Sequence, residues 1–204
     1  MHTPLIILDF EATGLRPEQG DRITEVGLVR IEDGQITARY QSLVNCGVRV
    51  PASITAYTGI SQQMVDAAPC ARDVIREVVD FVGDTTLVAH NAGLDQRLLQ
   101  RECRHARVGM LIEPFICSMR LARRVYPQLQ SHSLGVLAKK LELRSCGAAH
   151  RAAADAELTA ELMLRMCRDI TARHSSVALN AWMLRGLMHT PVAEVNTRLE
   201  RLCA

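Results

Sequence analysis

The chain has 204 residues, of which 48% are hydrophobic and 23% charged, and this balance excludes a largely disordered protein. At this length we expect one domain with a sizeable core and no second full domain. The net charge of +2 identifies no class of partner by itself, and the aromatic content of 3% argues against an extended platform for stacking many bases.

The start of the chain lacks the pattern of a signal peptide. The opening "MHTP" has no basic region, and the apolar run that follows it ends at Asp9. No apolar run is long enough to cross a membrane. The seven cysteines are scattered without a Cys-x-x-Cys pair, which favours reduced thiols over a disulfide framework. We therefore expect a cytoplasmic protein that is not bound to a membrane.

A short aliphatic run, "LIIL" at residues 5–8, predicts a buried strand that leads into "DFEATGL". Side chains alternate across a strand, so Asp9 and Glu11 project from the same side. Two carboxylates at the edge of a core raise each other's pKa unless a metal ion or an arginine lies between them. Gly14 allows the chain to turn and a ligand to come near. The pattern indicates a site, with two solvated acids as the alternative if these residues are taken alone.

The segments that follow predict two more strands and then an alternation of helices and strands. Segments 22–31 and 36–45, separated by the turn "EDGQ", predict a hairpin, and 51–61 is a turn-rich connection. The remaining expected elements are helices at 71–83, 92–103, 119–126, 134–143 and 150–170 and strands at 85–91 and 113–118. This order predicts an α/β fold with a mixed five-stranded sheet flanked by helices, parallel in its second half.

Residues 174–204 form an extension beyond the predicted domain, which covers 1–173. Two short helices are expected at 176–188 and 192–202, separated by Pro191. The extension packs on the domain, joins two subunits or binds a partner, and the sequence does not choose among these uses.

Two further acids are predicted to point toward the core from the first turns of helices. Asp95 has Leu98 and Leu99 at i+3 and i+4 on its own side, and Asp155 shares a helical stripe with Leu158. Taken alone, Asp95 is better explained as an acid favoured by the helix dipole, and for Asp155 the two explanations are balanced. The case for a site rests on the conjunction of four inward-facing acids.

His150 stands five residues before Asp155, about 140° round an unbroken helix, so it reaches the same site only from a position at or before the helix start. Carboxylate ligation selects hard cations such as Mg²⁺ or Mn²⁺. Four acids can hold two such ions about 3.5 to 4 Å apart, where one activates a water and the other stabilises the leaving oxygen of a phosphodiester. A histidine exchanges protons near neutral pH, which suits it to take the proton from that water.

Three segments, "DFEATGL", "HNAGLD" and "HRAAADA", resemble in this order the motifs of the DEDDh 3′→5′ exonucleases. The resemblance covers residues 4–170 and includes "ITAYTGIS" and "SHSLGVLAKKLEL". It implies a ribonuclease H-like fold and an enzyme that hydrolyses phosphodiester bonds from the 3′ end of DNA or RNA. It also implies two Mg²⁺ or Mn²⁺ ions per active site and release of nucleoside 5′-monophosphates. The implied partner is a nucleic acid with a free 3′ end, single-stranded or frayed. If the extension joins subunits or binds a partner, we expect a second copy or a polymerase there.

The resemblance also implies a role for each candidate residue. By the family's pattern, Asp9 bridges both metal ions, Glu11 and Asp155 hold the ion on the nucleophile side, Asp95 serves the other ion, and His150 is the general base.

Four more positions are expected on the substrate side of the site. Thr13, Gly14 and Leu15 are expected to lie against the terminal nucleotide through backbone groups and an apolar wedge. Asn91 matches a motif position and is grouped with these substrate-binding residues, without a defined role.

Two other interpretations are open on the sequence. "LDFEATG" loosely resembles the Asp-x-Asp-x-Thr start of haloacid-dehalogenase-type phosphatases, which also need a later lysine and an acidic pair. The only lysines, Lys139 and Lys140, are adjacent on a predicted amphipathic helix, and no acidic pair follows. A non-catalytic nucleic-acid-binding module on the same fold would normally have lost one of the four acids, and none is missing here.

Overall fold

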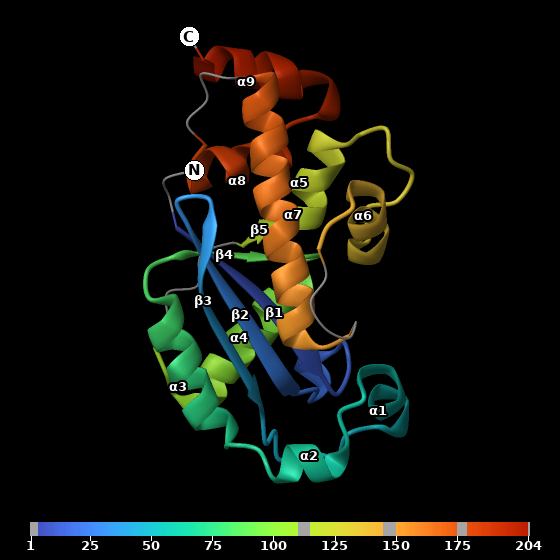
Figure 1. Cartoon of the computed structure of the whole chain (residues 1–204). Helices are drawn as coiled ribbons and strands as arrows, with labels where there is room; N and C mark the ends of the chain where they lie inside the picture. Colours follow the sequence, from blue (N-terminus) through green and yellow to red (C-terminus); the bar gives the residue numbers. More distant parts are fainter. Residues whose placement is uncertain (1–3, 110–114, 145–149, 175–178, 204) are drawn as a thin grey trace.

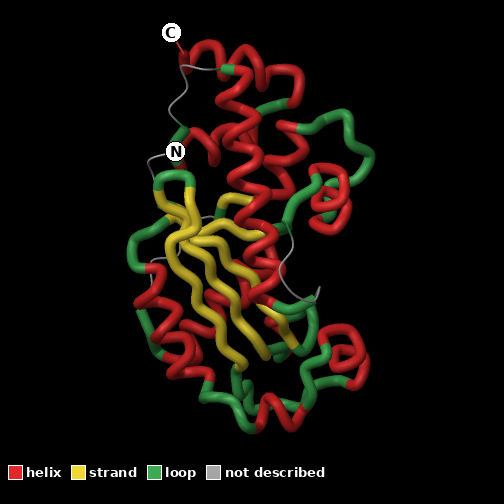
Figure 2. Tube along the Cα trace, viewed as in Figure 1, coloured by secondary structure: helices red, strands yellow, loops and turns green. Residues whose placement is uncertain are grey.

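The computed structural model describes residues 4–109, 115–144, 150–174 and 179–203. Figure 2 shows its strands as one twisted layer with helices on both sides. The strands are β1 (Leu5–Ala12), β2 (Ile23–Glu32), β3 (Gln35–Leu43), β4 (Thr86–Ala89) and β5 (Ile116–Cys117). They are arranged in the order β3-β2-β1-β4-β5.

Strand β1 is the centre of the sheet. It pairs antiparallel with β2 and parallel with β4, while β3 adds to β2 antiparallel and β5 adds to β4 parallel. All four side chains of residues 5–8 are fully buried, as expected for a strand covered on both faces. The predicted mixed five-stranded sheet with a parallel second half is therefore confirmed.

The register of β1 against β2 determines which residues lie opposite Asp9 and Glu11. Asp9 lies opposite Gly27, and Glu11 lies opposite Glu25. Directly opposite residues of an antiparallel pair project from the same face, so these four positions share one side of the sheet.

Helices cover both faces of the sheet. In the described residues before the extension, the helices are α1 (Ala52–Thr58), α2 (Gln62–Asp66), α3 (Ala71–Val82), α4 (Gly93–Ala106), α5 (Ser118–Val125), α6 (Leu134–Leu141) and α7 (Ala152–Arg173). The long helix α7 crosses the front of β1 and β2, and α4 lies behind the sheet (Figure 1). The helices predicted after residue 70 are thus all present, with shifted ends.

Three predicted boundaries need correction. The connection at 51–61 contains α1, which the sequence concealed because only Thr58 of that helix is buried and no apolar stripe marks it. The strand predicted at 113–118 is reduced to β5, and residues 113 and 114 lie outside the described residues. The helix predicted at 150–170 begins at Ala152 and continues to Arg173, which leaves His150 outside it.

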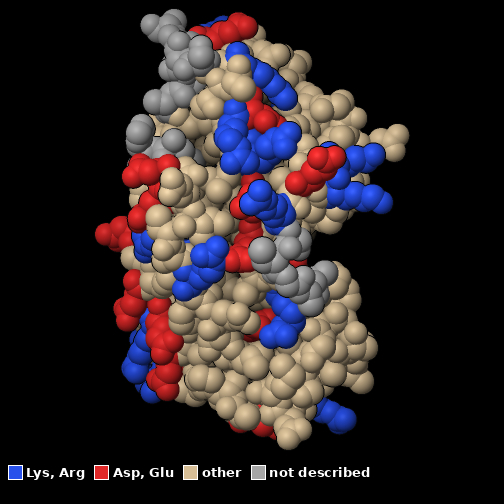
Figure 3. Space-filling view, in the orientation of Figure 1, with Lys and Arg blue, Asp and Glu red and all other residues tan. Residues whose placement is uncertain are grey.

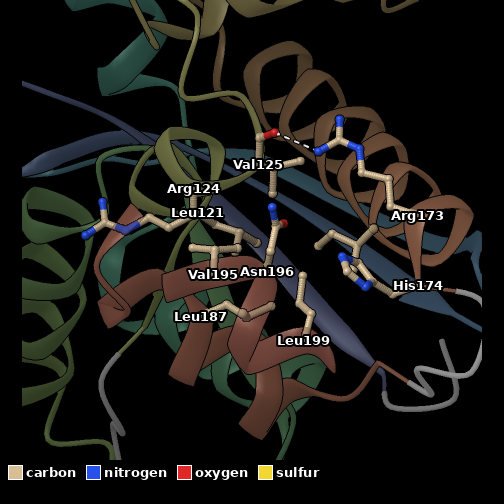
Figure 4. Close-up of a pocket in the computed structure, with 10 residues that line it drawn as sticks. Leu121, Arg124, Val125, Arg173, His174, Leu187, Val195, Asn196 and Leu199 are labelled. Carbon is tan, nitrogen blue, oxygen red and sulfur yellow. Dashed lines mark hydrogen bonds between the residues drawn. The ribbon is translucent and has the colours of Figure 1, made fainter. Parts of the chain in front are cut away.

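The extension forms α8 (Ala181–His189) and α9 (Val195–Cys203), separated by Pro191 as predicted. Their apolar side chains Leu184, Leu187 and Leu199 belong to the same buried cluster as β1. A small apolar pocket remains between α5, α7, α8 and α9, beside which Arg173 donates a hydrogen bond of 3.2 Å to the Val125 carbonyl (Figure 4). Packing on the domain is thus the observed use of these two helices.

A membrane-spanning helix was not expected. Among the helices of the described ranges, none combines the length and the apolar character that a bilayer crossing requires.

Candidate active site

Three carboxylates meet at the end of β1. One oxygen from each of Asp9, Glu11 and Asp155 lies within 4.8 Å of the other two. Asp9 and Glu11 come from β1, and Asp155 comes from the first turn of α7, which runs over the same face. All three side chains are partly exposed, so the cluster is reachable from solvent. Such a triplet of oxygens can hold a cation.

The fourth predicted acid lies beside this triplet. Asp95 is in the first turn of α4 and is only 7% exposed. Its carboxylate accepts a hydrogen bond of 3.2 Å from the backbone N–H of Phe10, which stands between the two acids of β1. Asp95 is thereby fixed to β1, and its charge raises the pKa of Asp9.

The pKa values of the four acids are raised above their ordinary values. Burial is the largest cause of each raised pKa; neighbouring carboxylates add to it for Asp9 and Glu11, while backbone hydrogen bonds oppose it for Asp95. The pKa of Asp9 is raised well above its ordinary value, and the pKa values of Glu11 and Asp95 are raised to about 7. Burial also raises the pKa of Asp155, while the adjacent His150 opposes this rise. The cluster is a strongly negative site that a bound cation would stabilise.

The donor set fits a hard divalent cation. All the ligand atoms are carboxylate oxygens, which suit Mg²⁺ and Mn²⁺, whereas zinc sites normally include cysteine or histidine. Burial of the acids, with mutual repulsion added at Asp9 and Glu11, is the physical reason for such an ion.

His150 lies beside Asp155, just before the start of α7. Its backbone has a φ of 62° and donates an N–H hydrogen bond of 3.3 Å to the Asp155 carboxylate. Its imidazole packs against the ring of Tyr57 in α1, with ring centroids 4.0 Å apart. The condition that this histidine must precede the helix to reach the acids is met.

The turn after β1 is held by hydrogen bonds within the chain. The hydroxyl of Thr13 donates to Asp21 and accepts from the N–H of Arg22, and its own backbone N–H is bonded to the Arg22 carbonyl. A Cβ at Gly14 would collide with the Asp21 carboxylate, so glycine is needed for that internal contact. Leu15 is 73% exposed and stands free for an external contact.

Asn91 lies at the turn between β4 and α4. Its side chain is exposed and its φ is 64°, a left-handed conformation that asparagine tolerates better than most residues. The left-handed backbone conformation is a structural reason for an asparagine at position 91. Its assignment as a substrate-binding residue stays a prediction.

Sequence reasoning missed three residues of this region. Tyr57 gave no signal, because nothing near it in the sequence indicates a ring contact with His150. Glu25 is a fully buried acid inside the apolar run "ITEVGLV", and that anomaly could have marked it. Arg151 forms an ion pair with Glu25 across 126 positions of sequence, a distance over which periodicity carries no information.

The metal-free protein should lose thermal stability as the pH rises from 5 to 7.5. Because the folded pKa values of Glu11 and Asp95 are raised to about 7, the folded state holds protons that the unfolded chain releases near pH 4. The associated stability is complete below about pH 4 and is lost as the pH rises through about 7. We expect the Tm to fall by about 5 °C. Scanning calorimetry in a chelating buffer measures this fall.

Two comparisons check the origin of that fall. Burial lowers the pKa of His90 to about 4, so this residue makes the protein more stable as the pH rises. The effect of this single histidine is outweighed by that of the several carboxylates. Glu11→Gln should shrink the fall, and Mg²⁺ should raise the Tm more at pH 7.5 than at pH 5. A Tm that rises steadily across this range without metal would contradict the electrostatic description of the site.

The fold and the site together define a hydrolase of phosphodiester bonds, with carboxylates gathered at the end of the central strand of a mixed sheet. The chain belongs to the RNase T exonuclease family, whose sequence profile matches residues 6–163. The resemblance to the DEDDh exonucleases is thereby confirmed, and the phosphatase interpretation is not favoured.

Curated relatives agree with this assignment. The chain is 32% identical to the DNA polymerase III subunit epsilon of Aquifex aeolicus over 165 residues, which cover 81% of each protein. It is 34% identical to the 3′-5′ exonuclease DinG of Bacillus subtilis over 81% of this chain but only 18% of that much longer protein.

A solved structure of exonuclease X in complex with 5′ overhanging duplex DNA superposes with a TM-score of 0.71 at 28% identity, covering 90% of this chain and 99% of the other. This match confirms the ribonuclease H-like fold. Family, relatives and fold together identify the activity as that of a 3′→5′ exonuclease.

Proposed function

We propose that the chain removes nucleotides one at a time from a free 3′ end of DNA or RNA by a two-metal-ion mechanism and releases nucleoside 5′-monophosphates. The observation that carries this proposal is the cluster of Asp9, Glu11 and Asp155, whose oxygens lie within 4.8 Å of one another at a solvent-accessible edge of the sheet. Asp95, fixed to the backbone between the two acids of β1, supplies a fourth carboxylate.

The ligand roles proposed for the acids are those of the family's pattern. Asp9 is placed centrally and would bridge two Mg²⁺ or Mn²⁺ ions, with Glu11 and Asp155 holding one ion and Asp95 serving the other. Bound there, such ions supply an activated water and stabilise the leaving oxygen of the phosphodiester. The fixed carboxylates keep this chemistry at the end of β1.

His150 is proposed as the general base. Its backbone N–H bond to Asp155 ties it to the first turn of α7, and its ring lies on the solvent side, against Tyr57. From this position an imidazole can take the proton of the attacking water without competing with the acids for a cation.

The polarity of cleavage is proposed from the turn that follows the two acids of β1. Thr13 fixes this turn through its bonds to Asp21 and Arg22, and Gly14 and Leu15 would then contact the terminal sugar and base. Water attacks the phosphorus, the bond to the 3′ oxygen of the penultimate nucleotide breaks, and the phosphate leaves on the 5′ side of the released nucleotide.

Positive charge is available for the rest of the strand. Lys and Arg side chains gather along α7 and over α6, above a hollow in the surface between α6 and α1 (Figure 3). Lys139 and Lys140 in the last turn of α6 are exposed. Ion pairing with phosphates is the general source of nucleic-acid affinity, so these groups support a strand that extends over α6.

The polarity is tested with a strand labelled at its 5′ end, the same strand carrying a 3′-phosphate, and a circular single strand. We expect a ladder that shortens from the 3′ side, slower decay of the 3′-phosphorylated strand, and no cleavage of the circle, because a chain without an end cannot enter the turn at Leu15. Efficient cutting of the circle would instead identify an endonuclease. Chromatography of the products should show nucleoside 5′-monophosphates.

The extension at 174–204 is proposed to contact a second copy of the chain or a polymerase. Trp182 on α8 is 68% exposed, and a DNA polymerase III subunit is among the relatives, which supports a contact there. A cytoplasmic location is proposed with it, since the relatives include a bacterial replication protein.

A further inference from the structure

A fifth acid lies next to the four that form the site. Glu25 is in β2, directly opposite Glu11, and its side chain is 0% exposed. Like charges opposite each other in a sheet repel, and a fully buried carboxylate is costly without partners. The contacts of Glu25 must therefore explain why it stands there.

Both carboxylate oxygens of Glu25 are bound by the residues that start α7. Arg151 approaches as a fork, with its Nη2 2.6 Å from Oε1 and its Nε 3.0 Å from Oε2. The backbone N–H of Ala152 donates to Oε2 at 3.0 Å. Arg151 is the N-cap residue of α7 but makes no side-chain cap bond, so Glu25 satisfies a donor that the helix itself leaves open.

The backbone of β2 also packs closely against the start of α7. A Cβ on Gly27, the residue opposite Asp9, would collide with the backbone of Ala152 and Ala153. The start of α7 thus rests on β2 at the two positions that face Asp9 and Glu11 across the strands. This contact sets where Asp155, three residues beyond Ala152, meets the acids of β1.

We propose that Glu25 is a positioning residue of the exonuclease site, which fixes the start of α7 so that Asp155 and His150 stand over Asp9 and Glu11. The same contact holds the Arg151 guanidinium on β2, so that this cation does not occupy Glu11 in place of a metal ion. The proposal rests on the proposed function, because it assumes that these acids bind the metal.

The test measures the Kd for Mn²⁺ by calorimetry, and kcat and KM on a single strand with a free 3′ end. Glu25→Gln keeps an acceptor for Ala152 but loses the charge that holds Arg151. We expect the Kd to rise and kcat to fall, each by about 10-fold or more, the usual effect of losing a group that orients metal ligands. KM for the strand should change far less, since Glu25 is buried away from it.

Glu102→Gln is the matched control. Glu102 is also buried, 1% exposed, and is held by a fork from Arg22 at 2.7 and 2.8 Å, but it lies on α4 and is seven residues beyond Asp95. This variant should lose comparable thermal stability and keep the wild-type Kd for Mn²⁺. Equal changes in Kd for the two variants would show that Glu25 has only a structural role and would overturn the proposal.

Two further variants, Arg151→Lys and Asp9→Asn, complete the test. Should Glu25→Gln fail to fold, Arg151→Lys replaces it, keeping the charge but not the fork, and a rise in Kd for Mn²⁺ is again expected. Asp9→Asn separates the proposed function from the role of Glu25. If it binds Mn²⁺ as tightly as wild type, the proposed function fails; if it does not, while Glu25→Gln binds like wild type, only the role of Glu25 fails.

Discussion

Asp9→Asn should reduce phosphodiester cleavage by about 10³-fold or more while the protein remains folded. Asp9 is the central acid of the cluster, and a metal ion contributes several kcal/mol of transition-state stabilisation that this change would remove. Asp155→Asn should have a similar effect, since it removes a ligand from the same triplet. Single-turnover decay of a 5′-labelled strand in saturating Mg²⁺ measures the loss.

Glu157→Gln is the control for this prediction. Glu157 lies two residues after Asp155 on α7 but pairs with Arg39 on β3, away from the cluster, so its neutralisation should leave the rate unchanged. In a chelating buffer, Asp9→Asn should unfold at the same or a higher temperature than wild type, because one repelling charge is gone. A folded Asp9→Asn protein with a near wild-type rate in Mg²⁺ would disprove the metal assignment.

The four acids of the candidate site could be predicted from the sequence, because periodicity gives the side to which each one points and their conjunction in three motifs groups them. Alternation along a strand places Asp9 and Glu11 on one side, and helical spacing from buried leucines turns Asp95 and Asp155 inward. These are local relations, and the structure brings three of the acids to within 4.8 Å with the fourth beside them. The mixed sheet with a parallel second half followed in the same way from the succession of elements, whereas the order of its strands was not predicted.

The parts that sequence reasoning missed depend on contacts between distant segments. The fork from Arg151 to Glu25 joins residues 126 positions apart, and the ring contact of Tyr57 with His150 joins α1 to the start of α7. Gly14 shows the same limit. The sequence indicated a turn at this glycine, but not that the Asp21 side chain packs against it and leaves no room for a Cβ. Local patterns locate a residue in an element but do not identify its neighbour.

His150→Ala should lower the rate of cleavage by about 10² to 10⁴-fold at neutral pH, the usual effect of removing a general base. The Kd for Mn²⁺ should change little, because the imidazole packs on Tyr57 and only the backbone N–H of this residue bonds to Asp155. The variant keeps that N–H, so the start of α7 should stay in place. Rates on a 5′-labelled strand and calorimetric Mn²⁺ binding are measured on the same preparation.

A matched histidine and a chemical rescue decide between a base and a merely structural side chain. His105→Ala, an exposed residue in the last turn of α4, should keep the wild-type rate. Added imidazole should restore part of the activity of His150→Ala and none of that of Asp9→Asn, because a small base can replace a lost proton acceptor but not a lost ligand. A loss below a few-fold, or no rescue together with weakened Mn²⁺ binding, would assign the proton to another acceptor and leave His150 as part of the scaffold around Asp155.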